Sequence, residues 1–202
     1  TGDADVRMTV MRTGTEANLT ASQTIKYATA AATGAGETLA TSGADFTAAN
    51  GTLTFDTTTL NEGAELSASD TTITLLSSSG FATGGGVITI DNEDMSYSGV
   101  TGNNLTGVVR GINGTTAAVH TDGAGNAVNE TGVYVDVVST HDTTSEIAEN
   151  FALTLNTASA GTIADATGIG TIIDNDASTV TYGKAVQLQG TANSWLYHTD
   201  AG

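Results

Sequence analysis

The chain has no cysteine and no proline, and it has few lysines. Without cysteine, neither a disulfide framework nor a thiolate metal site can form. Proline and lysine commonly protect the edges of β-sheets from pairing with other chains. Only Lys26 and Lys184 are available here for that purpose. Two interpretations stay open: the sheet edges of this protein are meant to pair, or the composition has drifted without consequence.

Basic residues are scarce as a class. The 202 residues include 22 acidic and 5 basic side chains, which gives a formal net charge of −17. Nucleic-acid phosphates and anionic membrane surfaces both attract lysine and arginine, so we expect neither as a partner. No apolar run approaches the length of a transmembrane helix, so we expect no membrane insertion. The chain begins Thr1-Gly2-Asp3 without a signal peptide, and we expect a processed or trimmed product.

Familiar catalytic motifs are missing as well. The sequence has no Gly-x-Ser-x-Gly elbow, no His-Glu-x-x-His zinc helix and no phosphate-binding loop. Paired carboxylates could in principle serve glycoside hydrolysis. However, aromatic residues that stack on sugars make up only 5% of the chain, and a cation site accounts for the carboxylates. We therefore predict that the protein is not an enzyme.

Short runs of alternating apolar residues recur along the chain, whereas sustained helical periodicity is absent. Glycine-rich turns separate most of these runs. The runs fall at residues 6–10, 25–27, 53–55, 73–75, 87–90, 95–97, 105–109, 133–137, 151–155, 169–173 and 186–188. Many short strands with frequent turns predict an all-β protein, built as an antiparallel β-sandwich.

Two clusters of carboxylates lie next to these predicted strands. One lies in residues 141–149, just before the run 151–155, and the other is Asp174-Asn175-Asp176, just after the run 169–173. Crowded carboxylates repel one another and lose hydration, so they need a cation nearby. Hard oxygen ligands in loops favour calcium. The sequence therefore predicts a β-protein that calcium stabilises.

Four blocks of the sequence, taken in order, resemble the Calx-beta domain family. They are residues 25–30, residues 41–55, the acidic loop ending in Glu149-Asn150-Phe151, and the closing residues 172–176. The resemblance implies a seven-stranded, immunoglobulin-like sandwich that binds calcium at one end. Members of this family occur in the regulatory regions of sodium–calcium exchangers and in arrays on bacterial surface proteins.

The same resemblance implies a set of calcium ligands. By their match to the family pattern, these are Asp45, Asp142, Glu146, Glu149, Asp174 and Asp176. His141 stands where the family usually has another aspartate, and only Asp3 or Asp5 could replace the acidic residue that follows the family's first strand. Fewer carboxylates favour one bound calcium over several. The alternative is a solvated acidic rim that holds no metal.

Residues 60–131 form an insertion that is much longer than an ordinary loop. It has its own strand pattern and resembles a small β-module of phage structural proteins and other surface proteins. We therefore predict a discontinuous sandwich of residues 1–59 and 132–176, interrupted by this module. Residues 91–94 are expected to form a hairpin turn, with a second cation site as the alternative. Arg110 is expected to pair with a local carboxylate, and His120 to pack within the module instead of binding metal.

The chain also resembles a family domain offset by one strand. The family's first strand has no counterpart before residues 6–10, and residues 177–202 add a strand and an aromatic tail after Asp176. A sandwich that lacks an edge strand exposes backbone N–H and C=O groups. A spare strand from another copy could fill that gap by β-augmentation; the alternative is a tail that folds back into its own sandwich. The residues predicted at the joint are Val180, Tyr182, Val186, Leu188, Trp195 and Tyr197.

These inferences favour a non-catalytic structural subunit of an extracellular filament or cell-surface array. Such a subunit would be assembled head-to-tail as a homopolymer, by strand donation between copies, and stabilised by calcium. The alternative is a calcium-dependent adhesin, or a phage or virion decoration domain, whose inserted module binds a glycan or a protein.

Overall fold

The computed structural model describes residues 5–33, 38–140, 145–173, 185–187 and 195–197. It confirms the predicted all-β fold, because the described residues contain fourteen strands and a single helical turn, η1 (Glu16–Asn18). None of the described residues forms a helix long and apolar enough to cross a bilayer. The strands are β1 (Val6–Met11), β2 (Gln23–Ala31), β3 (Asn50–Phe55), β4 (Thr57–Leu60), β5 (Thr72–Thr74), β6 (Gly86–Ile90), β7 (Glu93–Tyr97), β8 (Gly99–Thr101), β9 (Asn104–Thr106), β10 (Gly123–Val137), β11 (Glu149–Ala158), β12 (Thr167–Ile172), β13 (Ala185–Gln187) and β14 (Trp195–Tyr197).

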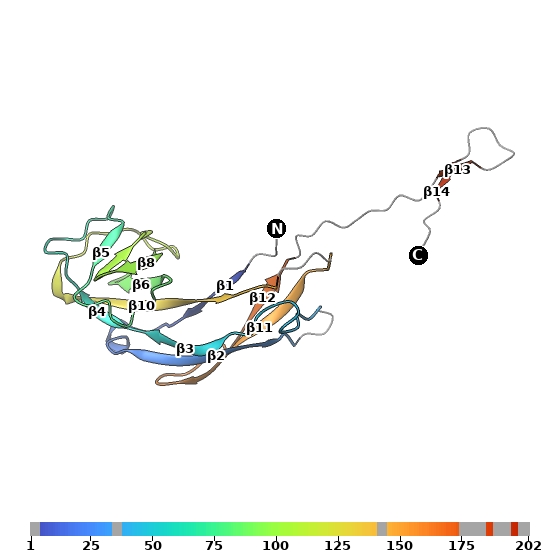
Figure 1. Cartoon of the computed structure of the whole chain (residues 1–202). Coiled ribbons are helices and arrows are strands. Elements are labelled where there is room, and N and C mark those ends of the chain that lie inside the picture. The colour runs from blue at the N-terminus through green and yellow to red at the C-terminus, as the bar shows by residue number, and fades with distance from the viewer. Residues whose placement is uncertain (1–4, 34–37, 141–144, 174–184, 188–194, 198–202) are drawn as a thin grey trace.

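Two antiparallel sheets form the sandwich. The first has the order β1-β10-β6-β7, with β4 also paired to β10, and the second has the order β12-β11-β2-β3. A smaller three-stranded sheet, β5-β9-β8, lies at the end of the molecule that also holds β4 and β6 (Figure 1). The strands β13 and β14 pair with each other.

The fifteen-residue strand β10 organises the first sheet. Val128 pairs with both Thr58 of β4 and Ile90 of β6, whereas Val133 pairs with both Val10 of β1 and Gly86 of β6. Because a strand has two edges, β4 and β1 must occupy successive lengths of the same edge, opposite β6. β10 therefore crosses the predicted boundary between residues 131 and 132.

A β-bulge divides β10 into two halves. The pairing with β6 shifts between Glu130 and Gly132. One extra residue reverses which face of the sheet each later side chain meets. Before the bulge Val128 is buried, and after it Val133, Val135 and Val137 are buried, which lies one residue out of phase. The bulge thus lets a single strand line two hydrophobic cores.

The first core lies within residues 60–128. Its members come mainly from β5, β6, β7, β9 and the loops between them, and they are Leu60, Leu66, Ile73, Leu75, Phe81, Ile88, Ile90, Met95, Tyr97, Leu105, Val108 and Val128. The second core fills the space between the two large sheets, and its buried members are Val10, Ala40, Phe46, Leu53, Phe55, Val133, Val135, Val137, Phe151, Leu153 and Ile172. Both cores follow the strand alternation that the sequence displays.

Candidate metal site and buried acidic groups

A tight turn between β2 and β3 fixes Asp45. The backbone N–H of Asp45 donates to the carbonyl oxygen of Thr41 at 2.9 Å, and the Thr41 N–H donates back to Asp45 Oδ2 at 2.5 Å. Gly43, with φ of 89°, supplies the left-handed backbone that this turn requires. Phe46, which is fully buried, anchors the turn on the second core. Asp45 is therefore held by both its backbone and its side chain.

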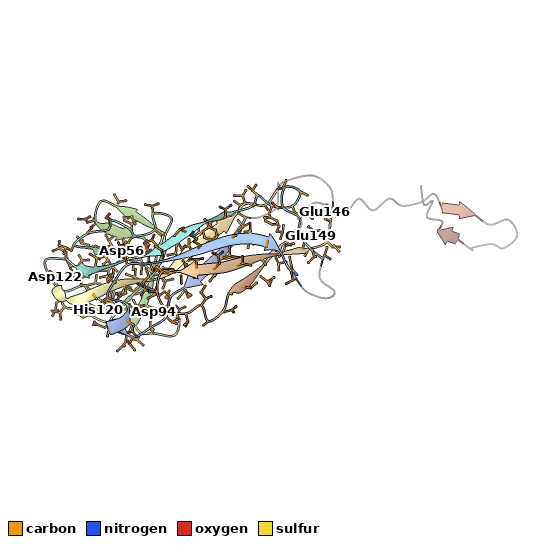
Figure 2. The ribbon with its side chains drawn as sticks, turned by 90° about the horizontal axis from the view of Figure 1, so that it is seen from below. Asp56, Asp94, His120, Asp122, Glu146 and Glu149 are labelled. Atoms are coloured by element: carbon orange, nitrogen blue, oxygen red, sulfur yellow. The ribbon has the colours of Figure 1, made fainter. Side chains whose placement is uncertain are left out.

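The strand β11 brings the other two carboxylates to the same end. Glu149 is the first residue of β11 and pairs with Ile172, the last residue of β12, while Glu146 lies three residues earlier in an exposed loop. The Ala40 N–H donates to the Asn150 carbonyl oxygen at 2.9 Å, so the segment that leads to Asp45 runs beside the start of β11. Figure 2 shows Glu146 and Glu149 together at one end of the body.

One carboxylate oxygen from each of Asp45, Glu146 and Glu149 lies within 4.8 Å of the others. Partial burial, together with the neighbouring carboxylates of Asp45 and Glu146, raises the pKa of Glu149 to about 7. Either a proton or a cation relieves such repulsion between carboxylates. This cluster could therefore hold a metal ion. The donor set is all oxygen, which is the set that hard divalent cations take.

The structure brings together three of the six ligands that the family resemblance implies. Asp142, Asp174 and Asp176 lie outside the described residues, as do His141 and Asp3. In the chain, Asp174 and Asp176 directly follow β12, whose last residue pairs with Glu149. Asp5 accepts a hydrogen bond from the Ser139 N–H at 3.1 Å, on the strand extension next to Phe46.

The opposite end of the body holds a buried ionic network (Figure 2). The sequence predicted some of its members but not their pairing. The expected hairpin joins β6 to β7, but its turn is shorter than predicted: Ile90 pairs with Glu93 across Asp91 and Asn92, and Glu93 and Asp94 already belong to β7. Asp91 has φ of 52°, a left-handed conformation that aspartate tolerates in such turns. Arg110 binds a local carboxylate as expected: its Nε and Nη2 donate to Glu93 at 2.8 Å each.

His120 completes that network. Its Nδ1 lies 2.7 Å from Asp91 Oδ2 and its Nε2 lies 2.8 Å from Glu93 Oε2, and the ring is buried, as its predicted packing role requires. Burial by itself raises the pKa of Glu93, but hydrogen bonds from Arg110, the Ala118 N–H and His120 outweigh that effect and lower this pKa to about 2. The carboxylate is therefore ionised and fully partnered, which suits a structural role.

Sequence reasoning missed a second buried acid, Glu130. It lies at the start of the bulge in β10 and accepts hydrogen bonds from Tyr97 Oη at 2.5 Å and from the Ala82 N–H at 3.0 Å. Burial is the main cause that raises the pKa of Glu130. Arg12 donates through Nη2 to the Glu130 carbonyl oxygen at 2.7 Å. The one available signal was the polar triplet Asn129-Glu130-Thr131 inside an otherwise strand-like run.

Half of the six residues predicted at the joint lie beyond the described part of the chain. Val180, Tyr182 and Leu188 lie outside it. Val186 belongs to β13, and Trp195 and Tyr197 belong to β14, where Gln187 pairs with Trp195 and Ala185 pairs with Tyr197. Comparisons of the chain with models of protein families, with curated proteins and with solved structures find no match.

The carboxylate cluster predicts a pH dependence of stability without metal. Between about 4.5, the ordinary pKa of a glutamate, and about 7, the folded chain binds more protons at Glu149 than the unfolded chain does. The contribution of Glu149 to stability then falls as pH rises through this window. Thermal melting in chelator should show this decline, and Glu149→Gln should reduce it, whereas the exposed Glu65→Gln should leave it unchanged. An unchanged profile in Glu149→Gln would show that this carboxylate is not strained by its neighbours.

Proposed function

We propose that the protein is a non-catalytic structural subunit of an extracellular or surface assembly, built on a Calx-beta-like sandwich that calcium stabilises. The observation that carries the calcium part is the convergence of Asp45, Glu146 and Glu149 from separate segments at one end of the sandwich. An ion bound there cross-links the β2–β3 turn to the start of β11. Millimolar calcium is typical outside cells, and an affinity on the order of 0.1–1 mM suffices for an extracellular module.

Calcium is expected to raise the stability of the folded chain. With a dissociation constant on the order of 0.1–1 mM, 10 mM calcium should add about 1–3 kcal/mol by mass action. The gain should show as a higher melting midpoint at pH 8, where the carboxylates are ionised, with magnesium less effective. Asp45→Asn and Glu149→Gln should each reduce it, and Glu65→Gln should keep it. Equal midpoints in calcium and in chelator would exclude a stabilising calcium.

The assembly part is supported by two features of the described residues. The edge strands β1 and β12 each pair with one other strand, so their outer backbone groups face away from the sheets. The sequence also has no proline and only two lysines, so it lacks two common protections of such edges. A chain with these edges is suited to pair with a copy of itself by strand donation.

Electron microscopy of the full-length chain in millimolar calcium tests the assembly. We expect regular filaments or arrays, and we expect them to be lost when residues 177–202 are deleted, while the melting midpoint of the sandwich changes little. Dispersed particles of the full-length chain, at every concentration and calcium level tried, would contradict a self-assembling subunit. They would favour the adhesin alternative, in which the inserted module with its own core at residues 60–128 binds a glycan or a protein.

A further inference from the structure

A groove of about 820 Å³ opens the sandwich along one side. One wall is β1 with the residues after it, 12–14, and the other is the hairpin that joins β11 to β12, residues 158–168. β1 and β12 lie side by side here, although they belong to different sheets (Figure 1). A Cβ added to Gly168 would stand 2.9 Å from Met8 Cε, so the two walls approach each other closely at Met8.

The floor of this groove is the second core itself. Val10, Phe55 and Leu153 are buried at its base. Met8, Ile25 and Leu155 also line it, and they are only partly buried. Apolar side chains that pack against a core yet remain partly open to solvent gain from a further apolar cover. The groove therefore suits an apolar segment.

The rim supplies backbone groups for a strand. Among the described residues, β1 pairs with β10 and with no strand on its other edge, and β12 likewise pairs only with β11. Such an edge presents unpaired N–H and C=O groups, which pair with any extended segment laid beside them. An occupant that runs along β1 thus gains main-chain hydrogen bonds as well as apolar contacts.

Arg12 lines the groove beside β1 and is held by backbone acceptors. Its Nη1 donates to the Ala21 carbonyl oxygen at 3.1 Å, and its guanidinium stands 5.5 Å from the centre of the Phe55 ring. Its Nε is buried and has no hydrogen-bond partner among the described residues. A buried donor without a partner is costly, by about 1–3 kcal/mol.

We propose that this groove accepts residues 177–184 of a second copy of the chain, as a strand added to the free edge of β1. Val180 and Tyr182 are two residues apart, so in a strand both would face the apolar floor. Eight extended residues span roughly 26 Å, enough to cover the six residues of β1 at roughly 20 Å. This inference rests on the proposed self-assembly and names its acceptor site.

Charge and connectivity favour a second copy. Lys184 and Asp200 are the only lysine, arginine or acidic residues in 177–202, so this segment is close to neutral, whereas residues 1–176 carry the acidic excess. Two acidic bodies repel each other, and a neutral segment joins them at the least electrostatic cost. A chain's own tail follows the end of β12, whereas Thr167 and Gly168 line the groove at the start of β12, so that tail would have to turn back to reach it. A tail from a neighbour needs no such reversal.

Disulfide trapping in full-length chains tests the acceptor site, since the native chain has no cysteine. Thr9→Cys places a thiol on the exposed rim of β1, and Thr181→Cys places one in the donor segment. The matched control is Thr101→Cys, an exposed threonine in β8 outside the groove. The two single variants, with tags of different size, are mixed in millimolar calcium and oxidised. We expect the heterodimer of Thr9→Cys with Thr181→Cys to exceed that of Thr101→Cys with Thr181→Cys at least tenfold.

The other outcomes separate the acceptor site from the assembly. Filaments that form without preferential trapping at Thr9 would overturn the groove as the acceptor and leave self-assembly standing. If no filaments form, the proposed function fails. The double variant Thr9→Cys/Thr181→Cys then shows whether the groove binds residues 177–184 at all. An intrachain disulfide in that monomer would show that the tail fills its own groove, which overturns the role of a second copy. If the two thiols of that monomer stay reduced, the groove does not accept this segment from either copy.

Discussion

Replacing Arg110 by methionine is expected to lower the free energy of unfolding by about 3–5 kcal/mol, the usual cost of breaking a buried ion pair. The side chains of Arg110 and Glu93 are 7% and 2% exposed. Without the guanidinium, the Glu93 carboxylate keeps only His120 and backbone N–H groups as partners in a site with little water. Arg110 also donates to the backbone carbonyl oxygens of Ser67 and Ala118, which lose those bonds. Urea unfolding measures the change.

Arg7→Met is the matched control. Arg7 makes the same kind of ion pair, with Nε 2.7 Å from Asp136 Oδ1, but the two side chains are 54% and 50% exposed. Water already solvates both charges, so we expect little or no loss of stability. Adding Glu93→Gln to Arg110→Met should recover part of the stability, because no unpaired charge then remains buried. Equal losses in Arg7→Met and Arg110→Met would show that burial does not govern the Arg110 pair.

Gly170→Ala is expected to cost about 1–3 kcal/mol, which is the range for overpacking a core. Gly170 pairs with Phe151 across β12 and β11, and an added Cβ would lie 2.3 Å from Phe151 Cζ. The Phe151 ring has little freedom to move away, because it is fully buried and packs on Phe46 with ring centres 5.1 Å apart. Thermal melting with calcium held constant measures the loss.

A double-variant cycle tests that this clash is the cause. Phe151→Ala alone should cost about 3–5 kcal/mol through the cavity it leaves. In that background Gly170→Ala should cost almost nothing, since the ring it collides with is gone, so the two losses should not add. Gly84→Ala is the control for glycine replacement: a Cβ there meets nothing within 4 Å, and we expect a change within about 0.5 kcal/mol. Additive losses would point to strain in the backbone of β12 instead.

Period-two alternation predicted the strands well where one face is buried. The runs at residues 87–90 and 95–97 become β6 and β7, and the runs at 133–137 and 151–155 become parts of β10 and β11. The alternation could not show that β10 is continuous from Gly123, because the bulge at Glu130 breaks the period in the middle of the strand. A single extra residue is invisible to a pattern that is counted in twos.

The buried charges were harder to foresee than the strands. Arg110 was expected to find a local carboxylate, since it is a lone cation in an acidic stretch, but its partner was not identified. Glu93 lies in a hairpin next to exposed Asp91, and only the folded register places it beside Arg110 and His120. Likewise, the pairing of Asp45 with Glu149 depends on two segments that are distant in sequence. Sequence spacing gives the residue types of such sites, while tertiary pairing gives their geometry.

The position of β10 also sets the order in which the chain can fold. β1 must wait for its partner strand β10 to be synthesised, because Arg7 contacts Asp136, which lies 129 positions further along the chain. The first core needs only residues 60–128, whose contacts close much shorter loops. During synthesis that core can therefore form first and fix the beginning of β10 before the sandwich closes. The large sheets must then assemble through long-range pairings, which we expect to make folding slow, on the millisecond-to-second scale.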